Sequence, residues 1–363
     1  MKILIVTDAW LPQAHGVVNS LVELVRELQA ARHEVVVLHP GQFRRWRGPA
    51  WLGIDIALLP GRRLSRLVRE AEPDAIHIAT EGPLGWAARA HCRREGLPFT
   101  SSWWLRLPER LHQRLRVPPA WTQAWLRRFH GASQGVLVPG RQTLDRLLAQ
   151  GLRQARGWSP GVDTGLFAPG APALAAGLLG PLAHPVSLYV GQVSHDHRIE
   201  DFLRLDVPGS KLVCGAGPQV DALRQRYPNV HWLGHLPRRV LAQVYGAADV
   251  LVHPGRDEAP AAVVLEALAC GTPVAGYPSD GMLQCFGQSP AAALRSDLRE
   301  AWSEALRIPR HVAREHAQAF AWPRAARRFV AELRTLPRPS PARMPKAPVP
   351  LLVPSSQATK AIT

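Results

Sequence analysis

The chain has 363 residues, 46% of them hydrophobic and 20% charged, and it carries a formal net charge of +16. That length suits two domains of ordinary size, and the balance of residues is typical of a soluble globular protein. No apolar run reaches the roughly 18–20 residues that cross a bilayer, so no membrane-spanning helix is predicted.

The excess positive charge comes almost entirely from arginine and is compatible with nucleic acid, anionic lipid or an anionic substrate. The sequence has no nucleic-acid-binding motif, so a nucleic-acid partner is not expected. Its four cysteines are scattered without metal-ligand spacing, which favours reduced thiols in the cytoplasm and no metal site. The N-terminus, MKILIVTDAWLPQ, has too short an apolar run for a signal peptide and is expected to form a strand.

The first half of the chain alternates apolar strands with amphipathic helices. Leu21, Leu24, Val25 and Leu28, for example, lie on one face of a helix predicted over residues 21–31. Strands are predicted at 2–8, 33–40, 55–60, 74–80, 97–104 and 135–140. Further helices are predicted at 63–73, 83–96 and 141–151. This spacing indicates a parallel sheet that is covered on both faces.

The same alternation restarts after an Ala/Pro/Gly-rich stretch at 168–185, which we interpret as an interdomain linker. Strands are predicted at 186–191, 210–215, 230–234, 249–254 and 273–278, and helices at 198–205, 219–228, 238–248, 260–271, 296–308 and 323–336. We therefore predict an α/β protein of two Rossmann-like, doubly wound domains that face a cleft. The domains are 1–170 and 171–336, and a Pro-rich disordered tail follows at 337–363.

Glycines follow the strands at two places where a ligand would approach. Gly16 lies after the first strand and just before a helix, where backbone amides and the helix dipole favour an anion. Gly215 and Gly217, in CGAGPQ, follow a strand of the second half. The alternative is that these glycines only form turns. A full dinucleotide fingerprint is absent, so the sequence gives little support for NAD or FAD.

Two glutamates, Glu258 and Glu266, have seven residues between them. Glu258 is predicted in the loop that leads into a helix starting near Pro260, and Glu266 two turns into that helix. Carboxylate oxygens accept strongly from paired hydroxyls, so the pair suits the hydroxyls of a sugar and of a ribose. The alternative is a solvated acid at the helix N-terminus and a second acid on the helix surface.

Together these stretches resemble glycosyltransferase family 4, whose members are retaining enzymes with the GT-B fold. The likeness extends over roughly residues 1–335 and is strongest to bacterial mannosyl- and glucosyltransferases of glycolipid synthesis. It is carried, in order, by TDAWLPQAHGVVNSL, AIHIATEGPLGWAAR, LPFTSSWWLRLPE, GVDTGLF, YVGQVSHDHRIEDFL, VCGAGPQ, AADVLVHPGRDEAPAAVVLEALACGTPVAGYP and FAWPRAARRFVAEL.

The resemblance implies a hexosyltransferase that moves a sugar from a nucleotide diphosphate donor to a hydroxyl acceptor, a lipid or glycan, with retention of configuration. By resemblance, Glu258 is the catalytic-site acid that contacts the donor hexose, and Glu266 contacts the ribose. Gly16, Gly215 and Gly217 would lie along the donor. No metal or other cofactor is implied, and the enzyme is expected in the cytoplasm, peripheral to the inner membrane face.

The chain also departs from the family at several positions, and the Phe-Gly that commonly follows the first glutamate is Pro260-Ala261 here. Gln192 and His197 stand where the family has a basic pair that grips the donor diphosphate, and Trp104 stands where it has a histidine. Without a metal, fixed cations must stabilise the leaving group. Arg198 and Arg256 are candidate substitutes. The alternative is a catalytically impaired GT-B pseudoenzyme that binds nucleotide sugars or acts as a scaffold, and a GT-B epimerase or phosphorylase is a third reading.

The segment 110–131 combines tryptophans with arginines. Trp121 and Trp125 lie four residues apart on a predicted helix, which suits contact with an anionic membrane surface. The flanking cations are Arg114, Arg116, Arg127 and Arg128. The alternative is that both tryptophans pack against the sheet of the first domain.

Overall fold

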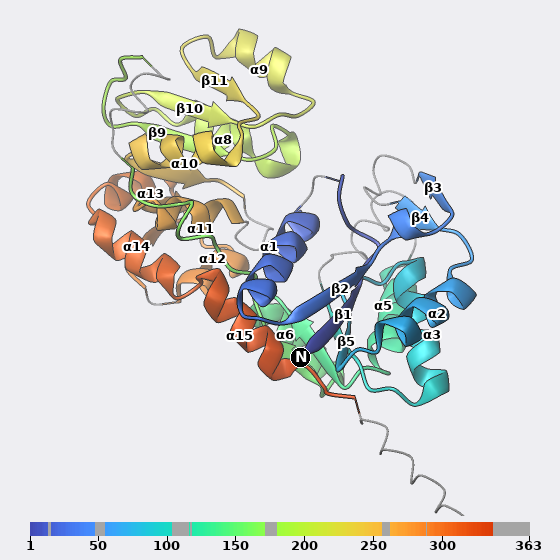
Figure 1. The fold of residues 1–363 in the computed structure, drawn as a ribbon. Helices are drawn as coiled ribbons and strands as arrows, with labels where there is room; N and C mark the ends of the chain where they lie inside the picture. The colour runs from blue at the N-terminus through green and yellow to red at the C-terminus, as the bar shows by residue number, and fades with distance from the viewer. Residues whose placement is uncertain are drawn as a thin grey trace, which may run out of the picture.

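The computed structural model describes residues 1–13, 16–47, 55–103, 116, 118–170, 180–255, 262–287 and 289–336. Two six-stranded sheets, each purely parallel, form the two halves of the molecule (Figure 1). The predicted α/β architecture of two Rossmann-like domains is therefore confirmed. Trp104, Arg114, Arg256, Glu258 and the predicted tail lie outside the described residues.

The first sheet has the strand order β2-β1-β5-β6-β7-β8. These strands are β1 (Lys2–Val6), β2 (Glu34–Leu38), β5 (Ala75–Ile78), β6 (Thr100–Ser102), β7 (Gly135–Val138) and β8 (Ala155–Gly157), with a small antiparallel pair, β3 (Arg45–Arg47) and β4 (Asp55–Ala57), beside them. The helices are α1 (Gly16–Ala30), α2 (Gly61–Ala71), α3 (Pro83–Glu95), α5 (Pro119–His130) and α6 (Arg141–Ala149), and a 3-10 turn, η1, spans Pro40–Gln42. Helix α1 begins five residues before the start that its apolar face predicted.

The side chains of β1 show why this strand reads as a continuous apolar run. Leu4 and Val6 pack in the cluster under α2 and α3, whereas Ile3 and Ile5 pack on the opposite face against α1. All four are fully buried. A strand covered on both faces needs apolar residues at every position, because alternate side chains point to opposite faces.

The second sheet has the order β11-β10-β9-β12-β13-β14. Its strands are β9 (Ser187–Val190), β10 (Lys211–Cys214), β11 (His231–Gly234), β12 (Val250–His253), β13 (Val274–Gly276) and β14 (Ala292–Leu294). Its helical elements are η2 (His195–His197), α8 (Ile199–Arg204), α9 (Val220–Arg226), α10 (Arg238–Ala247), α11 (Ala262–Ala269), α12 (Asp280–Phe286), α13 (Leu298–Ala305) and α14 (Arg310–Gln318).

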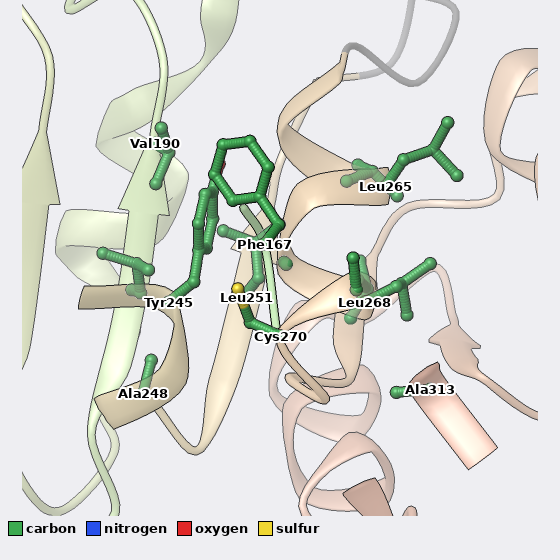
Figure 2. Packing of buried hydrophobic residues seen from close by; sticks show 14 of the residues in the cluster. Phe167, Val190, Tyr245, Ala248, Leu251, Leu265, Leu268, Cys270 and Ala313 are labelled. Atoms are coloured by element: carbon green, nitrogen blue, oxygen red, sulfur yellow. The ribbon is translucent and has the colours of Figure 1, made fainter. Parts of the chain in front are cut away.

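The core of the second half includes a residue from the segment that joins the two sheets. Phe167 is fully buried and packs edge-on against Tyr245 of α10, with ring centroids 6.0 Å apart (Figure 2). Leu251 and Leu268 lie in the same cluster. The connecting chain therefore enters the second core before residue 170, where the sequence places the domain boundary. The division at 170/171 itself stays a prediction.

The last helix, α15 (Trp322–Glu332), lies beside α1 and away from the second sheet (Figure 1). Trp322 and Phe329 are buried with Ile3 and Ile5 of the first sheet. After this helix, Thr335 forms a bridge to Ala75. The chain order assigned α15 to the second domain, but its apolar face completes the core of the first.

No helix among the described residues is long and apolar enough to span a membrane.

Candidate functional site

Glu266 of α11 lies at the junction of the two halves. Its neighbours Leu265, Ala267 and Leu268 are buried in the second core, and its own side chain is only 12% exposed. The Tyr245 hydroxyl donates to Glu266 Oε2 over 3.4 Å. Burial raises the pKa of Glu266 to about 7, although the nearby Arg238 guanidinium opposes the rise. The buried environment makes this acid a candidate functional group.

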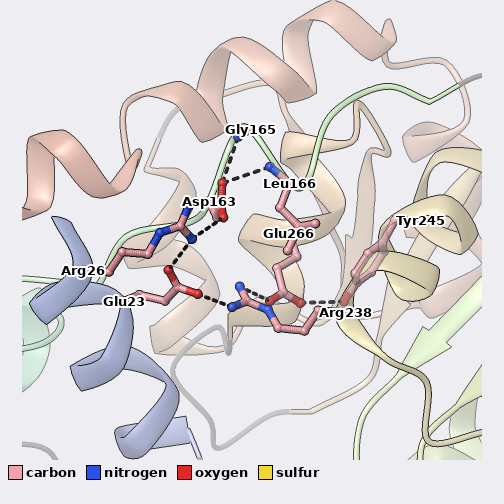
Figure 3. A network of polar contacts seen from close by, with 8 residues as sticks. All are labelled: Glu23, Arg26, Asp163, Gly165, Leu166, Arg238, Tyr245 and Glu266. Carbon is pink, nitrogen blue, oxygen red and sulfur yellow. Dashed lines mark hydrogen bonds and ion pairs between the residues drawn. The ribbon is translucent and has the colours of Figure 1, made fainter. Parts of the chain in front are cut away.

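Arg238, the first residue of α10, connects Glu266 to the other half of the molecule. Its Nη2 lies 3.8 Å from Glu266 Oε1, and its Nη1 donates to Glu23 of α1 in a close ion pair (Figure 3). The guanidinium also lies over the ring of Phe167, 5.3 Å from the centroid. A cation at a helix N-terminus is opposed by the helix dipole, so its carboxylate partners must supply the stabilisation.

Two further charges extend this network along α1. Arg26 lies 3.4 Å from Glu23 and 3.5 Å from Asp163, which precedes the second core in the chain (Figure 3). Asp163 in turn accepts from the backbone N–H groups of Gly165 and Leu166. Charged groups of both domains therefore meet around Arg238, which sequence reasoning did not identify.

A pocket of about 160 Å³ lies at the carboxyl ends of β9 and β12. Gln192, His197 and His253 all line it. The assignment of Gln192 and His197 to a donor diphosphate stays a prediction. His197 Nδ1 lies 2.8 Å from the Ser194 hydroxyl. The sequence did not identify His253 as a site residue, because it ends the apolar strand DVLVHP and so was expected to belong to the core.

Gly215 and Gly217 bring the loop after β10 against the loop after β9. A Cβ at Gly215 would meet the Gly191 carbonyl oxygen at 1.8 Å, and one at Gly217 would meet the Val193 carbonyl oxygen at 2.2 Å. Gly215 also has φ +151°, which disfavours other residues. Gly16 differs, because a Cβ there would have nothing within 4 Å. The two loop glycines are thus needed for packing, and Gly16 stands open at the start of α1.

Arg198, a candidate substitute cation, is held by neighbouring side chains. It has φ +52°, its guanidinium lies 2.8 Å from Asp201, and it stacks over Tyr277 at 5.6 Å. The Tyr277 hydroxyl donates to the same carboxylate. A role for Arg198 at a diphosphate therefore requires it to leave or share Asp201. The role of either candidate, Arg198 or Arg256, stays a prediction.

The stretch TEGPLG packs around a buried carboxylate, Asp8. Asp8 accepts from the backbone N–H groups of Leu84 and Gly85 at the start of α3, at 2.9 and 3.3 Å. A Cβ at Gly82 would meet Asp8 Cγ at 2.3 Å, and one at Gly85 would meet the Thr80 carbonyl oxygen at 1.9 Å. Burial raises the pKa of Asp8 to about 6. Its position indicates that this acid caps and anchors α3.

A second buried group lies below Trp103, at the end of β6. His130 Nε2 lies 3.2 Å from Glu81 Oε1, and its Nδ1 lies 2.9 Å from the Ser101 hydroxyl. The Trp103 ring packs against the His130 ring, with centroids 4.9 Å apart. All these side chains are buried, so we interpret the group as a structural network that packs the end of β6 against α5.

The helix α5 presents one tryptophan to solvent and packs the other. Trp121 is 72% exposed and Trp125 is 37% exposed, and the Trp125 ring lies 5.4 Å from that of Trp86. Arg127 and Arg128 are exposed beside them. Packing inside the first domain therefore accounts for Trp125 in part and leaves Trp121 unexplained.

Among solved structures, the chain resembles sucrose-phosphate synthase from Thermosynechococcus elongatus, with a TM-score of 0.67 and 20% identity over 91% of this chain and 97% of that one. It also resembles Anabaena Alr3699/HepE in complex with UDP-glucose, with a TM-score of 0.64 and 15% identity over 91% and 98% of the two chains. At these identities the likeness shows the fold, which is the GT-B fold of glycosyltransferases.

The chain is also similar in sequence to characterised glycosyltransferases. A GDP-mannose-dependent alpha-mannosyltransferase of Mycobacterium tuberculosis is 29% identical over 77% of this chain and 81% of its own length. A relative of the same name from Corynebacterium glutamicum is 27% identical over 79% and 75% of the two chains.

Two family models match consecutive parts of the chain. Glycosyltransferase Family 4 matches residues 14–166, and Glycosyl transferases group 1 matches residues 185–308. The chain is therefore a glycosyltransferase whose first part matches family 4 and whose second part matches group 1.

Proposed function

We propose that the protein is a hexosyltransferase that moves a sugar from a nucleoside diphosphate donor to a hydroxyl acceptor with retention of configuration. The observation that carries the proposal is the buried Glu266 carboxylate at the junction of the two domains, where the family resemblance places the ribose. Since the relatives named above are GDP-mannose-dependent, GDP-mannose is the donor to test first. The reaction requires no metal or other cofactor.

In the proposed reaction, the acceptor oxygen bonds to the anomeric carbon on the face from which the diphosphate leaves. The bond from that carbon to the phosphate oxygen breaks, and the departing phosphate takes the proton of the acceptor hydroxyl. Glu266 holds the ribose, and Glu258 contacts the hexose by resemblance. The open backbone at Gly16, with the helix N-terminus behind it, suits the donor phosphate.

A binding panel tests the proposal directly. The wild-type protein is titrated with GDP-, UDP- and ADP-sugars, and its unfolding temperature is followed with each. A ligand that binds only the folded state stabilises it by an amount that grows with the logarithm of its concentration relative to the dissociation constant, so one nucleotide should raise the unfolding temperature at concentrations well above that constant. A chain that responds to none of them is not a transferase of this kind.

The alternative is a pseudoenzyme that binds nucleotide sugars and no longer transfers them. The pocket formed by Gln192, His197 and His253 favours it, since no arginine or lysine lines that pocket within the described part of the chain. Loss of fixed cations there would remove several kcal/mol of leaving-group stabilisation, or about 10² to 10⁴ in rate.

Restoring cations to this pocket distinguishes the two. If the diphosphate site is impaired, the double change Gln192→Arg and His197→Lys should tighten binding of a nucleotide sugar by about tenfold or more, because each charge would meet a phosphate oxygen in a partly dry cleft. Calorimetric titration measures the change. His195→Lys, which adds a charge on the same turn outside the pocket, is the matched control. Equal or weaker binding would mean that another cation already contacts the diphosphate.

We further propose that the acceptor is a lipid and that α5 docks on an anionic membrane surface. The support is the exposure of Trp121 beside Arg127 and Arg128. Tryptophan is enriched at the headgroup level of membranes, and arginines are attracted to anionic lipids by about 1 kcal/mol each.

The double change Trp121→Ala and Trp125→Ala should reduce sedimentation with anionic liposomes by several-fold and leave the domain folded. Raised salt should release the wild-type protein, because surface charges are screened. Leu283→Ala, at a 47% exposed apolar residue of the second domain, is the control and should bind as wild type. Equal retention on neutral liposomes, or none on anionic ones, would contradict a docking surface at α5.

A further inference from the structure

Arg238 is shared by carboxylates of the two domains. It pairs closely with Glu23 and lies 3.8 Å from Glu266 (Figure 3). A guanidinium carries five donors in a planar fork, so it can serve two carboxylates at once. The ring of Phe167, 5.3 Å from the guanidinium carbon, and the ion pair with Glu23 fix its place. Only 40% of the Arg238 side chain is exposed.

The state of the Glu266 carboxyl decides what it offers a ligand. An ionised carboxylate accepts hydrogen bonds through both oxygens, whereas a protonated carboxyl carries a donor and accepts less well. Ribose hydroxyls are donors, and bonds from a neutral donor to an ionised acceptor are the stronger ones. Glu266 must therefore be ionised to hold a ribose well, although its burial opposes that charge.

The described groups that face Glu266 come from three elements. Arg238 and Tyr245 approach it from α10, Glu23 of α1 lies across the junction, and Cys270 lies one turn further along its own segment. Arg238 is the cation of this set. The Glu23 carboxylate opposes ionisation of Glu266, so the arginine between the two acids separates like charges as well as pairing with them.

We infer that Arg238 is a positioning residue of the donor site, which keeps Glu266 ionised and aimed at the ribose of a ribonucleoside diphosphate. The inference rests on the proposed function, because it takes Glu266 as the ribose acceptor. It also adds to that function, because binding of the nucleoside would then depend on Arg238, which is paired with Glu23 of the first domain.

The test is the pH dependence of nucleotide binding by the full chain, with GDP and UDP as probes. Arg238→Gln should bind the preferred nucleotide about tenfold more weakly than wild type at pH 7, and the midpoint of its pH–affinity curve should lie about one unit higher. The direction of the shift in the midpoint follows from the ionisation of Glu266. Removing the cation raises the pKa of its carboxyl, so affinity is lost at neutral pH and returns near pH 9.

Two further variants keep the test specific. Arg238→Lys retains the charge and should retain most of the affinity. Arg239→Gln removes an exposed charge from the next position of the same helix and should bind as wild type. The nucleotide phosphate titrates identically in all variants, so differences between curves report the protein. Circular dichroism establishes that each variant is folded.

The possible outcomes distinguish failure of the role assigned to Arg238 from failure of the proposed transferase function. A wild-type chain that binds no nucleoside diphosphate overturns both. A wild-type chain that binds, with an Arg238→Gln variant that matches it at every pH, overturns the inference alone. An equal loss at pH 7 and pH 9 also overturns it, because a direct ligand or a purely structural residue would act independently of the ionisation of Glu266.

Discussion

Glu266→Ala is expected to weaken binding of the donor nucleotide by about 10- to 100-fold while leaving the fold intact. The lost hydrogen bonds to a charged acceptor are worth about 1.5–3 kcal/mol. Isothermal titration with the free nucleoside diphosphate measures the loss. Glu304→Ala, at a half-buried acid of α13 paired with Arg295, is the matched control and should bind as wild type. An unchanged dissociation constant would contradict the placement of the ribose at Glu266.

Replacing Glu266 is expected to weaken nucleotide binding but not to lower the stability of the fold at high pH. The pKa of Glu266 is raised from 4.5 to about 7, so the folded state keeps a proton that the unfolded chain releases at lower pH. The stability associated with that proton is present below pH 4.5 and is lost as the pH rises towards 7. Glu266→Gln removes this titration.

At pH 8 the Glu266→Gln variant should therefore unfold at an equal or higher temperature than wild type, although it binds nucleotide more weakly. Differential scanning fluorimetry at pH 5 and pH 8 measures this. A lower unfolding temperature at pH 8 would mean that the acid stabilises the domain junction. If Glu266→Gln binds nucleotide weakly and is as stable as wild type, the Glu266 carboxylate serves ligand binding and not folding.

Gly85→Ala is expected to destabilise the protein by about 3 kcal/mol. The added Cβ would lie 1.9 Å from the Thr80 carbonyl oxygen, a backbone atom, so α3 must move away. That movement also pulls the α3 amides from Asp8. Urea unfolding measures the change in free energy.

The control for this prediction is Gly61→Ala, at the first residue of α2. A Cβ there meets nothing within 4 Å, so the change should be neutral or stabilise by a few tenths of a kcal/mol to about 1 kcal/mol. If Gly85→Ala is as stable as Gly61→Ala, the close approach of α3 to the strand end is not needed for the fold.

The alternation of strands and helices was enough to predict the fold. Apolar runs such as KILIV and SLYV became strands buried on both faces, and the second run restarts the pattern after the linker. The place of α15 could not be predicted in this way. Its buried residues Trp322, Ala326 and Phe329 mark an apolar face, but the spacing does not say which sheet that face covers.

The site was predicted in part, and the rest depends on long-range geometry. Glu266, Gln192 and His197 follow from spacing and resemblance, and the structure places the last two around one pocket. Arg238 could not be found, because its ion pair with Glu23 joins residues of two domains whose relative placement no local pattern encodes. The one local signal is an arginine at the start of a helix, where the dipole disfavours it.

The central claim is that this chain transfers a hexose, and transfer of mannose from GDP-mannose to an extractable lipid tests it most directly. We predict that the wild-type protein forms a mannosylated lipid over many turnovers, with the anomeric configuration of the donor retained in its NMR spectrum, and that Glu266→Ala forms much less. Tight nucleotide binding without transfer to any lipid or glycan acceptor would contradict the claim and identify the protein as a nucleotide-sugar-binding pseudoenzyme.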